Sequence, residues 1–398
     1  MNVTNILNQS LAGVTAQMHE SRRTALSACV DSLLRGSSAT VTQLGRGLKS
    51  NAKEKHSIKR ADRLLSNPRL HAETMTIYTS MARTILEGIA RPIILVDWSD
   101  LDASKRHFLL RATLAMRGRC LTLYEEVHEV TTKEKPKTHR QYLRRLASIV
   151  GPACRPIIVT DAGFKTPWFR EVLALGWDFV GRSRKPNHYS LDDEHWQSIS
   201  VLYGQATSTA KVFSAYINHS NPLNCTMVLY KQKRRGRKDL TRQGRPRRSK
   251  KVLTHKKSAD DPWLLSTSLP RHQQLGKRIV NIYRTRMQIE EGFRDMKSSR
   301  FGLGFEQNDT RQRNRMTILI LLTTLANWVL MILGMAATLC DQHRQYQANT
   351  TRHKNVLSLP FIGLRVVADR SLRLGVRKLR QATLELNTLA RQACAVFC

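Results

Sequence analysis

The chain has 398 residues and a formal net charge of +36, with 66 Lys and Arg residues against 30 Asp and Glu residues. Its length predicts two or three domains and a substantial buried core. The positive charge exceeds what solubility requires and indicates a polyanionic partner, most simply nucleic acid, although an anionic membrane surface would also attract it. The 7 cysteines are scattered without a C-x-x-C pair, which argues against a disulfide framework and a zinc site.

The amino-terminal part, residues 1–90, has the pattern of a helical domain with clustered basic residues. No basic segment followed by an apolar core opens it, so we expect no secretory signal. Residues 38–48 predict a small helix and a glycine-bearing turn leading into a second basic segment, the outline of a helix-turn-helix. An ordinary helical bundle with a solvated basic face fits equally well. The candidate DNA-binding cations here are Arg46, Lys53, Lys59, Arg60 and Arg63.

From residue 91 the pattern changes to strands. Apolar runs at 92–97, about 106–116 and about 120–130 predict an antiparallel meander. Further along, a helix is expected at 138–149, a strand at 156–160, a helix at 167–175 and a strand at 177–180. A meander followed by alternating helices and strands predicts a mixed α/β sheet.

Two of these strand-like runs stop abruptly at an acid, Asp97 and Asp161. A buried strand that ends in this way delivers a carboxylate to the rim of a sheet, where functional residues concentrate. Asp97 and Asp161 are therefore candidate catalytic residues.

Residues 185–274 depart from this rhythm. Short runs at 198–203, 211–217 and 225–230 predict a β-rich insertion. Residues 231–251 within it are dense in Lys and Arg, including Arg234, Arg235 and Arg237, with Asp239 as the only acid. We interpret this basic loop as a contact to phosphates, with a solvated linker as the alternative.

Residues 281–297 predict a helix that carries chemistry. At about 3.6 residues per turn, Tyr283, Arg286, Glu290 and Lys297 fall on one side. A carboxylate can ligate Mg²⁺ while the two cations neutralise phosphate oxygens, so the stripe suits a metal-held phosphodiester. Taken alone, the stripe is more simply a solvated amphipathic helix with an Arg286–Glu290 pair.

Residues 316–340 carry no charge and are long enough to span a bilayer. Thr323, Thr324 and Asn327 interrupt the apolar surface, and the chain contains no second span of this kind. These details favour a buried core helix over a membrane span.

These motifs together resemble one enzyme family. Asp97 in VDWSD, Asp161 in TDAGF and the Tyr-x2-Arg-x3-Glu-x6-Lys spacing at 283–297 are similar to the DDE transposases of bacterial insertion sequences. The resemblance is nearest to the cut-and-paste branch with the Tyr-Arg-Glu-Lys signature, which includes the transposase of the composite tetracycline-resistance transposon. It covers nearly the whole chain, with further similar segments at 43–46, 59–67 and 347–358.

The resemblance implies an RNase H-like mixed-sheet core interrupted by a β-rich insertion, and it places residues 316–340 in the core as a central helix. The implied domains are a helical DNA-binding domain (1–90), the first part of the catalytic core (91–184), the insertion (185–274), the second part of the core (275–340) and a helical C-terminal region for dimerisation (341–398).

The resemblance also implies the chemistry. Asp97, Asp161 and Glu290 would be catalytic ligands of two Mg²⁺ ions per active site, with Mn²⁺ able to substitute. Their neighbours Asp100 and Glu291 are the acids most easily mistaken for them. The implied DNA contacts are Tyr283, Arg286 and Lys297 at the cleavage site and Trp263 stacked on an unpaired base, although Trp263 is equally well a core residue.

The expected reaction cuts one DNA strand, forms and reopens a hairpin, and joins the freed 3′-OH to target DNA. The partners would be double-stranded DNA at the element's inverted-repeat ends and target, and a second copy of the chain in the synaptic complex. We expect a bacterial cytoplasmic, nucleoid-associated endonuclease without a membrane partner. The alternatives are a metal-independent recombinase with Tyr283 as nucleophile, a membrane-associated basic protein and a non-catalytic DNA-binding protein.

Overall fold

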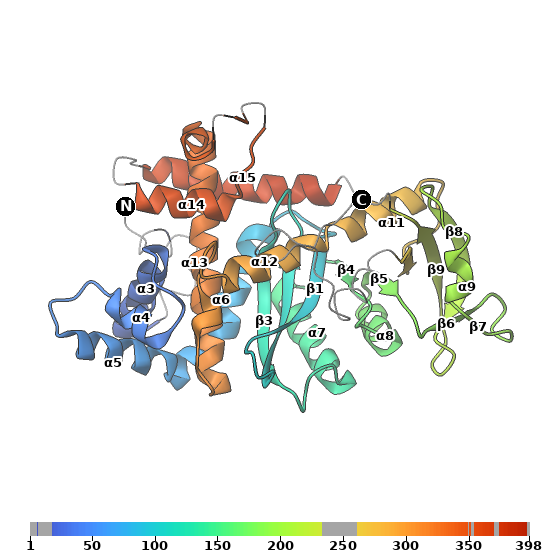
Figure 1. The fold of residues 1–398 in the computed structure, drawn as a ribbon, viewed down its shortest axis with the longest axis horizontal. Helices are drawn as coiled ribbons and strands as arrows, with labels where there is room; N and C mark the ends of the chain where they lie inside the picture. The colour runs from blue at the N-terminus through green and yellow to red at the C-terminus, as the bar shows by residue number, and fades with distance from the viewer. Residues whose placement is uncertain are drawn as a thin grey trace, which may run out of the picture. The chain divides into compact units, whose positions relative to one another are not determined.

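The computed structural model describes residues 6, 18–232, 261–348, 350–351, 354–369 and 374–395. The predicted contacts Arg234, Arg235 and Arg237 of the basic loop lie outside these ranges. The chain forms two compact units, one of Met1–Pro156 with Thr285–Cys398 and one of Ile157–Arg284. Figure 1 shows their elements.

The first unit begins with helices α3 (Glu20–Leu34), α4 (Val41–Arg46), α5 (Glu54–Leu65) and α6 (Pro68–Leu86). Three of them start at side-chain caps, because His19, Thr40 and Asn67 accept hydrogen bonds from the amides of Ser21, Gln43 and Leu70. Gly45 lets α4 approach α5 closely, since a Cβ there would lie 2.3 Å from Cα of Ile58.

Three antiparallel strands of the first unit follow, namely β1 (Ile93–Asp100), β2 (His107–Leu114) and β3 (Leu121–Glu129), in the order β3-β2-β1. The meander is as predicted, and helix α7 (Pro136–Val150) comes after it. The predicted end of the first strand at Asp97 is wrong. Asp97 lies inside β1 opposite Arg111, because Ser99 and Asp100 continue the ladder against Leu109 and Phe108. Backbone pairing extends the strand beyond its apolar run.

The second unit is a mixed sheet with helices. Its parallel pair is β4 (Ile157–Thr160) and β5 (Asp178–Ser183), joined through α8 (Thr166–Ala174). The sheet continues in the order β4-β5-β10-β9-β8-β6-β7. The other elements are β6 (His188–Ser190), β7 (Gln197–Ser198), α9 (Ser200–Tyr203), β8 (Lys211–Ile217), β9 (Leu223–Tyr230), β10 (Trp263–Thr267) and α11 (Leu275–Arg284). The mixed α/β architecture is confirmed.

One strand predicted in this unit is wrong. Residues 198–203 form only the end of β7 followed by the short helix α9. The Ser198 hydroxyl accepts a hydrogen bond from the Ser200 amide at 3.3 Å, and such a local serine contact offers the backbone an alternative to the ladder.

The first unit is completed by segments from the C-terminal part of the chain. They are α12 (Met287–Lys297), the 3₁₀ turn η1 (Phe305–Gln307), α13 (Arg313–Leu339), the 3₁₀ turn η2 (Gln342–Tyr346), α14 (Leu359–Ala368) and α15 (Val376–Ala395). Asn387 of α15 donates to the carbonyls of Ile85 (2.8 Å) and Glu87 (3.1 Å) at the end of α6. A side chain of α15 thereby satisfies backbone carbonyls at the end of α6.

Helix α13 contacts α3, α6, β3, α14 and α15 within this unit (Figure 1). It is the predicted apolar helix, and among the described residues it is the one helix long and apolar enough to cross a membrane. Of its most apolar 18-residue stretch, 94% is buried inside the protein. Gly334 of α13 faces the Leu359 carbonyl and Gly363 of α14 faces the Leu330 carbonyl, at positions where a Cβ would lie 2.1 and 2.2 Å from the oxygens. The two helices therefore pack backbone to backbone.

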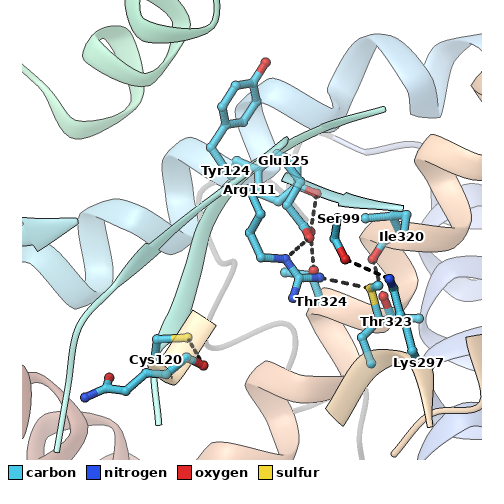
Figure 2. Close-up of polar contacts among 12 residues, drawn as sticks. Ser99, Arg111, Cys120, Tyr124, Glu125, Lys297, Ile320, Thr323 and Thr324 are labelled. Atoms are coloured by element: carbon cyan, nitrogen blue, oxygen red, sulfur yellow. Dashed lines mark hydrogen bonds and ion pairs between the residues drawn. The ribbon is translucent and has the colours of Figure 1, made fainter. Parts of the chain in front are cut away.

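A buried ion pair joins the meander to two helices of the first unit. Arg111 of β2 and Glu125 of β3 have side chains 4% and 1% exposed, and Arg111 Nε lies 2.5 Å from Glu125 Oε1. The other carboxylate oxygen accepts hydrogen bonds from Tyr78 of α6, at 3.1 Å, and Thr324 of α13. Figure 2 shows Arg111 and Thr324 converging on Glu125. Burial, reinforced by Glu125, raises the pKa of Tyr78, so the phenol stays a donor.

We expect Glu125→Gln to lower the free energy of unfolding by about 3–5 kcal/mol, because it leaves the Arg111 charge buried without a counterion. Urea denaturation followed by circular dichroism measures this change. The matched control is Glu129→Gln at the exposed end of the same strand, which should change stability by less than about 0.5 kcal/mol. Equal midpoints for the two variants would show that the pair contributes nothing to stability.

Candidate active site

The predicted helix over residues 281–297 is interrupted, so the prediction that one continuous helix carries all four side chains on one side is wrong. Helix α11 ends at Arg284, Thr285 and Arg286 form a turn, and α12 begins at Met287. No Gly or Pro marks the turn, and only the modest helix propensity of the β-branched Thr285 favours it locally. Tyr283 consequently belongs to the second unit, whereas Arg286, Glu290 and Lys297 belong to the first.

Arg286 joins two of the predicted catalytic acids. Its Nη1 lies 3.3 Å from Asp97 Oδ2 and its Nη2 lies 2.6 Å from Glu290 Oε1. The side chain of Asp97 is 13% exposed and that of Glu290 is 43% exposed. One guanidinium thus holds a carboxylate of β1 and a carboxylate of α12 around a single positive charge.

Asp97 is anchored through its neighbour. Its Oδ1 accepts a hydrogen bond of 2.8 Å from the amide of Trp98, and the Trp98 indole donates to Nε2 of His139 in α7 at 3.3 Å. Burial lowers the pKa of His139 to about 4, so this imidazole is neutral at pH 7 and can accept. The strand segment that carries Asp97 is therefore attached to α7, a connection that the sequence analysis missed.

Lys297 fastens the end of α12 to β1. Its ammonium donates to the Ser99 hydroxyl at 2.7 Å and to the Asp100 carbonyl, and Figure 2 shows Lys297 beside Ser99. Burial lowers the pKa of Lys297, while Asp100 raises it and Arg111 lowers it further. In the structure, this predicted DNA contact holds two elements of the first unit together.

The neighbouring acids have different partners. Glu291 and Asp295 both pair with Arg119, and Asp100 lies 3.7 Å from Lys105. Glu290 is thus the acid of α12 that shares a cation with Asp97, as the spacing argument favoured.

The second unit holds the other predicted residues of the cleavage site. Asp161 directly follows β4, and its Oδ1 accepts a hydrogen bond of 2.8 Å from the Gly163 amide, which closes a tight turn. The structure brings Asp97, Arg286 and Glu290 together in the first unit, while Asp161 belongs to the second.

An aromatic cluster surrounds Trp263 in the second unit. Its ring is half-buried at the start of β10, 5.0 Å from the Tyr283 ring in an edge-on arrangement and 6.0 Å from the Tyr230 ring. Tyr283 is only 4% exposed. Arg284, which the sequence analysis did not single out, donates to the Tyr230 hydroxyl at 2.8 Å.

The sequence model of the family described as "Transposase DDE domain" matches residues 89–328. This is more than half of the chain, and it includes Asp97, Asp161 and Glu290. The chain belongs to the DDE transposases. It is therefore an enzyme that acts on DNA, as the motifs predicted. A comparison with curated proteins gives no significant match.

DDE transposases typically use divalent metal ions, so this transposase needs side chains that can ligate such an ion. Among the residues that the structure describes, no group of three or more His, Cys, Asp or Glu side chains could hold a metal ion. Asp97 and Glu290 do converge on one cation, the Arg286 guanidinium. Carboxylate oxygens are hard ligands of the kind that Mg²⁺ prefers, so these two side chains fit a divalent ion.

The predicted DNA-binding cations of the transposase's amino-terminal helices lie mostly at the surface. Lys53, Lys59 and Arg63 are exposed, and Arg60 is half-buried. Arg46 is exposed and pairs with Glu54 at 2.7 Å. These positions leave the exposed side of α5 strongly basic.

Proposed function

We propose that this transposase catalyses cut-and-paste transposition of an insertion sequence, with Asp97, Asp161 and Glu290 as metal-binding catalytic residues. The observation that carries the proposal is the shared contact of Asp97 and Glu290 with Arg286, inside the region that matches the transposase domain. Two carboxylates that converge on one cation would together bind a divalent ion, which phosphodiester cleavage of this kind requires.

Two bound Mg²⁺ ions, with Mn²⁺ able to substitute, would activate the attacking oxygen and stabilise the leaving oxygen of an in-line displacement. The protein residues have complementary roles. Arg286 would exchange its carboxylate partners for phosphate oxygens of the DNA end, which its planar donors suit. Lys297 would keep α12 attached to β1 and add positive charge beside the cleaved strand.

The same residues would serve strand cleavage, hairpin formation, hairpin opening and joining to target DNA, because each step is a displacement at phosphorus. Holding two DNA ends together requires a synaptic complex, and we propose a homodimer of this chain for it. We place the enzyme in the bacterial cytoplasm at the nucleoid, without a membrane partner. The burial of α13 by protein supports the absence of a membrane partner.

DNA binding would be distributed over several basic surfaces. The exposed cations of α5 would contact the transposon ends, and phosphate contacts of this type supply affinity and register. Trp263 would stack on a displaced base beside Tyr283, which packs against it. The basic loop at 231–251 would add further phosphate contacts.

A covalent tyrosine mechanism fits the structure less well. A nucleophilic tyrosine must reach the scissile phosphate, whereas the ring of Tyr283 is buried against Trp263. This alternative also gives no role to the contact that joins Asp97 and Glu290 through Arg286.

The test is to incubate the purified protein with Mg²⁺ and the DNA that flanks its own reading frame. We expect nicks with 3′-OH ends at the element's borders, followed by hairpins on denaturing gels, and we expect EDTA to stop both and Mn²⁺ to restore them. Cleavage in EDTA with protein covalently attached to DNA would establish the tyrosine mechanism instead. Specific end binding without cleavage in either metal would identify a non-catalytic DNA-binding protein.

A further inference from the structure

The connection between β2 and β3 holds α12 through a side-chain amide. Gln288 Nε2 donates to the Met116 carbonyl at 2.6 Å, and the Met116 amide donates to Gln288 Oε1 at 3.0 Å. Met116 is only 3% exposed. Because both backbone groups of Met116 use this one amide, removing it would leave a buried donor and a buried acceptor without their partner.

Two further contacts reach the same side of α12. Arg119 donates to Asp295 at 2.8 Å and to Glu291, and the Cys120 thiol donates to the Gln288 carbonyl at 3.3 Å. Gln288, Glu291 and Asp295 are spaced i, i+3 and i+7, so they form one stripe of the helix. Residues 116–120 therefore hold one face of α12 through hydrogen bonds and ion pairs.

The buried ion pair contacts α12 on a different side of the helix. Arg111, held by Glu125, lies 4.8 Å from the Phe293 ring centroid and 3.0 Å from the Met296 sulfur. Gly292 also faces the hairpin, and a Cβ there would meet the Cys120 sulfur at an ordinary van der Waals distance of 3.4 Å. Contacts on more than one side of α12 therefore hold the helix against the hairpin.

Rotation decides which acid faces Asp97. Successive residues of a helix point about 100° apart, so Glu290 and Glu291 differ by that angle. With Glu291 held by Arg119, Glu290 points to Arg286 and Asp97. A loose α12 would present the Glu290 carboxylate over a range of directions.

We propose that Gln288 and Arg119 are positioning residues, which fix the rotation of α12 so that Glu290 is aligned with Asp97. The inference rests on the proposed function for the statement that Glu290 is catalytic. The grip on α12 is a property of the first unit alone and can be measured without DNA or metal.

The test uses Gln288→Met, which keeps the length of the side chain and removes its amide, and Arg119→Met, which removes the ion pairs. The matched control is Arg294→Met, which removes a cation from the exposed side of the same helix. Each purified protein is treated with iodoacetamide, and the alkylation rate of each cysteine is followed by mass spectrometry. Calorimetry with Mn²⁺ and cleavage at saturating DNA complete the comparison.

We expect Cys120 to be alkylated about tenfold faster in Gln288→Met and Arg119→Met than in the wild type, because a turned α12 moves the Gln288 carbonyl away from the thiol and breaks their hydrogen bond. Cys29 and Cys225, buried in other parts of the fold, should keep their wild-type rates. Mn²⁺ affinity and the rate of cleavage should fall about tenfold with end binding unchanged, and Arg119→Lys should recover part of both because it restores one ion pair.

Unchanged Cys120 alkylation and unchanged Mn²⁺ affinity in both variants would overturn the proposal. So would equal acceleration at Cys29, Cys120 and Cys225, because that pattern reports general unfolding rather than a turned helix. Failure of the proposed function has a different signature, since Glu290→Gln would then still cleave DNA while Cys120 alkylation continued to report the grip on α12.

Discussion

Replacement of Glu290 by Gln is expected to abolish DNA strand cleavage while leaving binding to the element's ends nearly intact. The variant keeps the size of the side chain and removes the charge that Arg286 holds together with Asp97. Metal-assisted stabilisation of the transition state is worth several kcal/mol, which corresponds to a loss of about 10³-fold in rate. Cleavage of labelled end DNA on denaturing gels, paired with gel-shift binding, measures both quantities.

Asp97→Asn should give the same loss for the same reason. The control on the same strand is Asp100→Asn, whose carboxylate faces Lys105 and should not affect the rate. Glu291→Gln should reduce cleavage only partly, because this acid holds α12 in place through Arg119. Active Glu290→Gln together with inactive Glu291→Gln would reverse the assignment of the catalytic acid.

Placing Asp at Leu322 is expected to remove the protein from the soluble fraction. Leu322 is 0% exposed in α13. Truncating a buried leucine costs about 2–5 kcal/mol, and a carboxylate without a partner adds to that cost, so the total approaches the stability of a typical domain. The measurement is the soluble fraction after mild lysis without detergent.

Asn314→Asp is the matched control for this helix. Asn314 is exposed in the first turn of α13, where an added negative charge interacts favourably with the helix dipole, so the variant should stay soluble. Recovery of the unmodified protein only in the membrane pellet would contradict the prediction and establish α13 as a membrane span.

The sequence analysis succeeded where local patterns decide the structure. The meander and the apolar helix α13 follow from runs of apolar residues. It failed where the structure depends on long-range strand pairing or on local polar contacts. The extension of β1 to Asp100 depends on pairing with β2, and the helix at Ser200–Tyr203 follows a serine contact.

The candidate site shows the same division. Glu290 was preferred to Glu291 from its spacing and from the family motif, and in the structure Glu290 pairs with Arg286 whereas Glu291 pairs with Arg119. No glycine or proline lies at the break after Arg284, so the local sequence does not predict it. The contacts of Gln288 with Met116 join residues far apart in the chain, and a glutamine in an amphipathic helix gives no sign of such a partner. The contacts of Arg119 and His139 were missed because they also join residues far apart in the chain.

The contact between Asn387 and the end of α6 also bears on how the protein is made. The second unit is one continuous stretch whose strands pair with one another, so its residues are all available before α12 to α15 have been made. The first unit combines segments on either side of the second unit, and the Ile85 and Glu87 carbonyls receive their Asn387 partner only after α15 has been made. Domains generally fold as units during synthesis. A ribosome that stops before residue 387 therefore releases a polypeptide in which α6 lacks this closing contact.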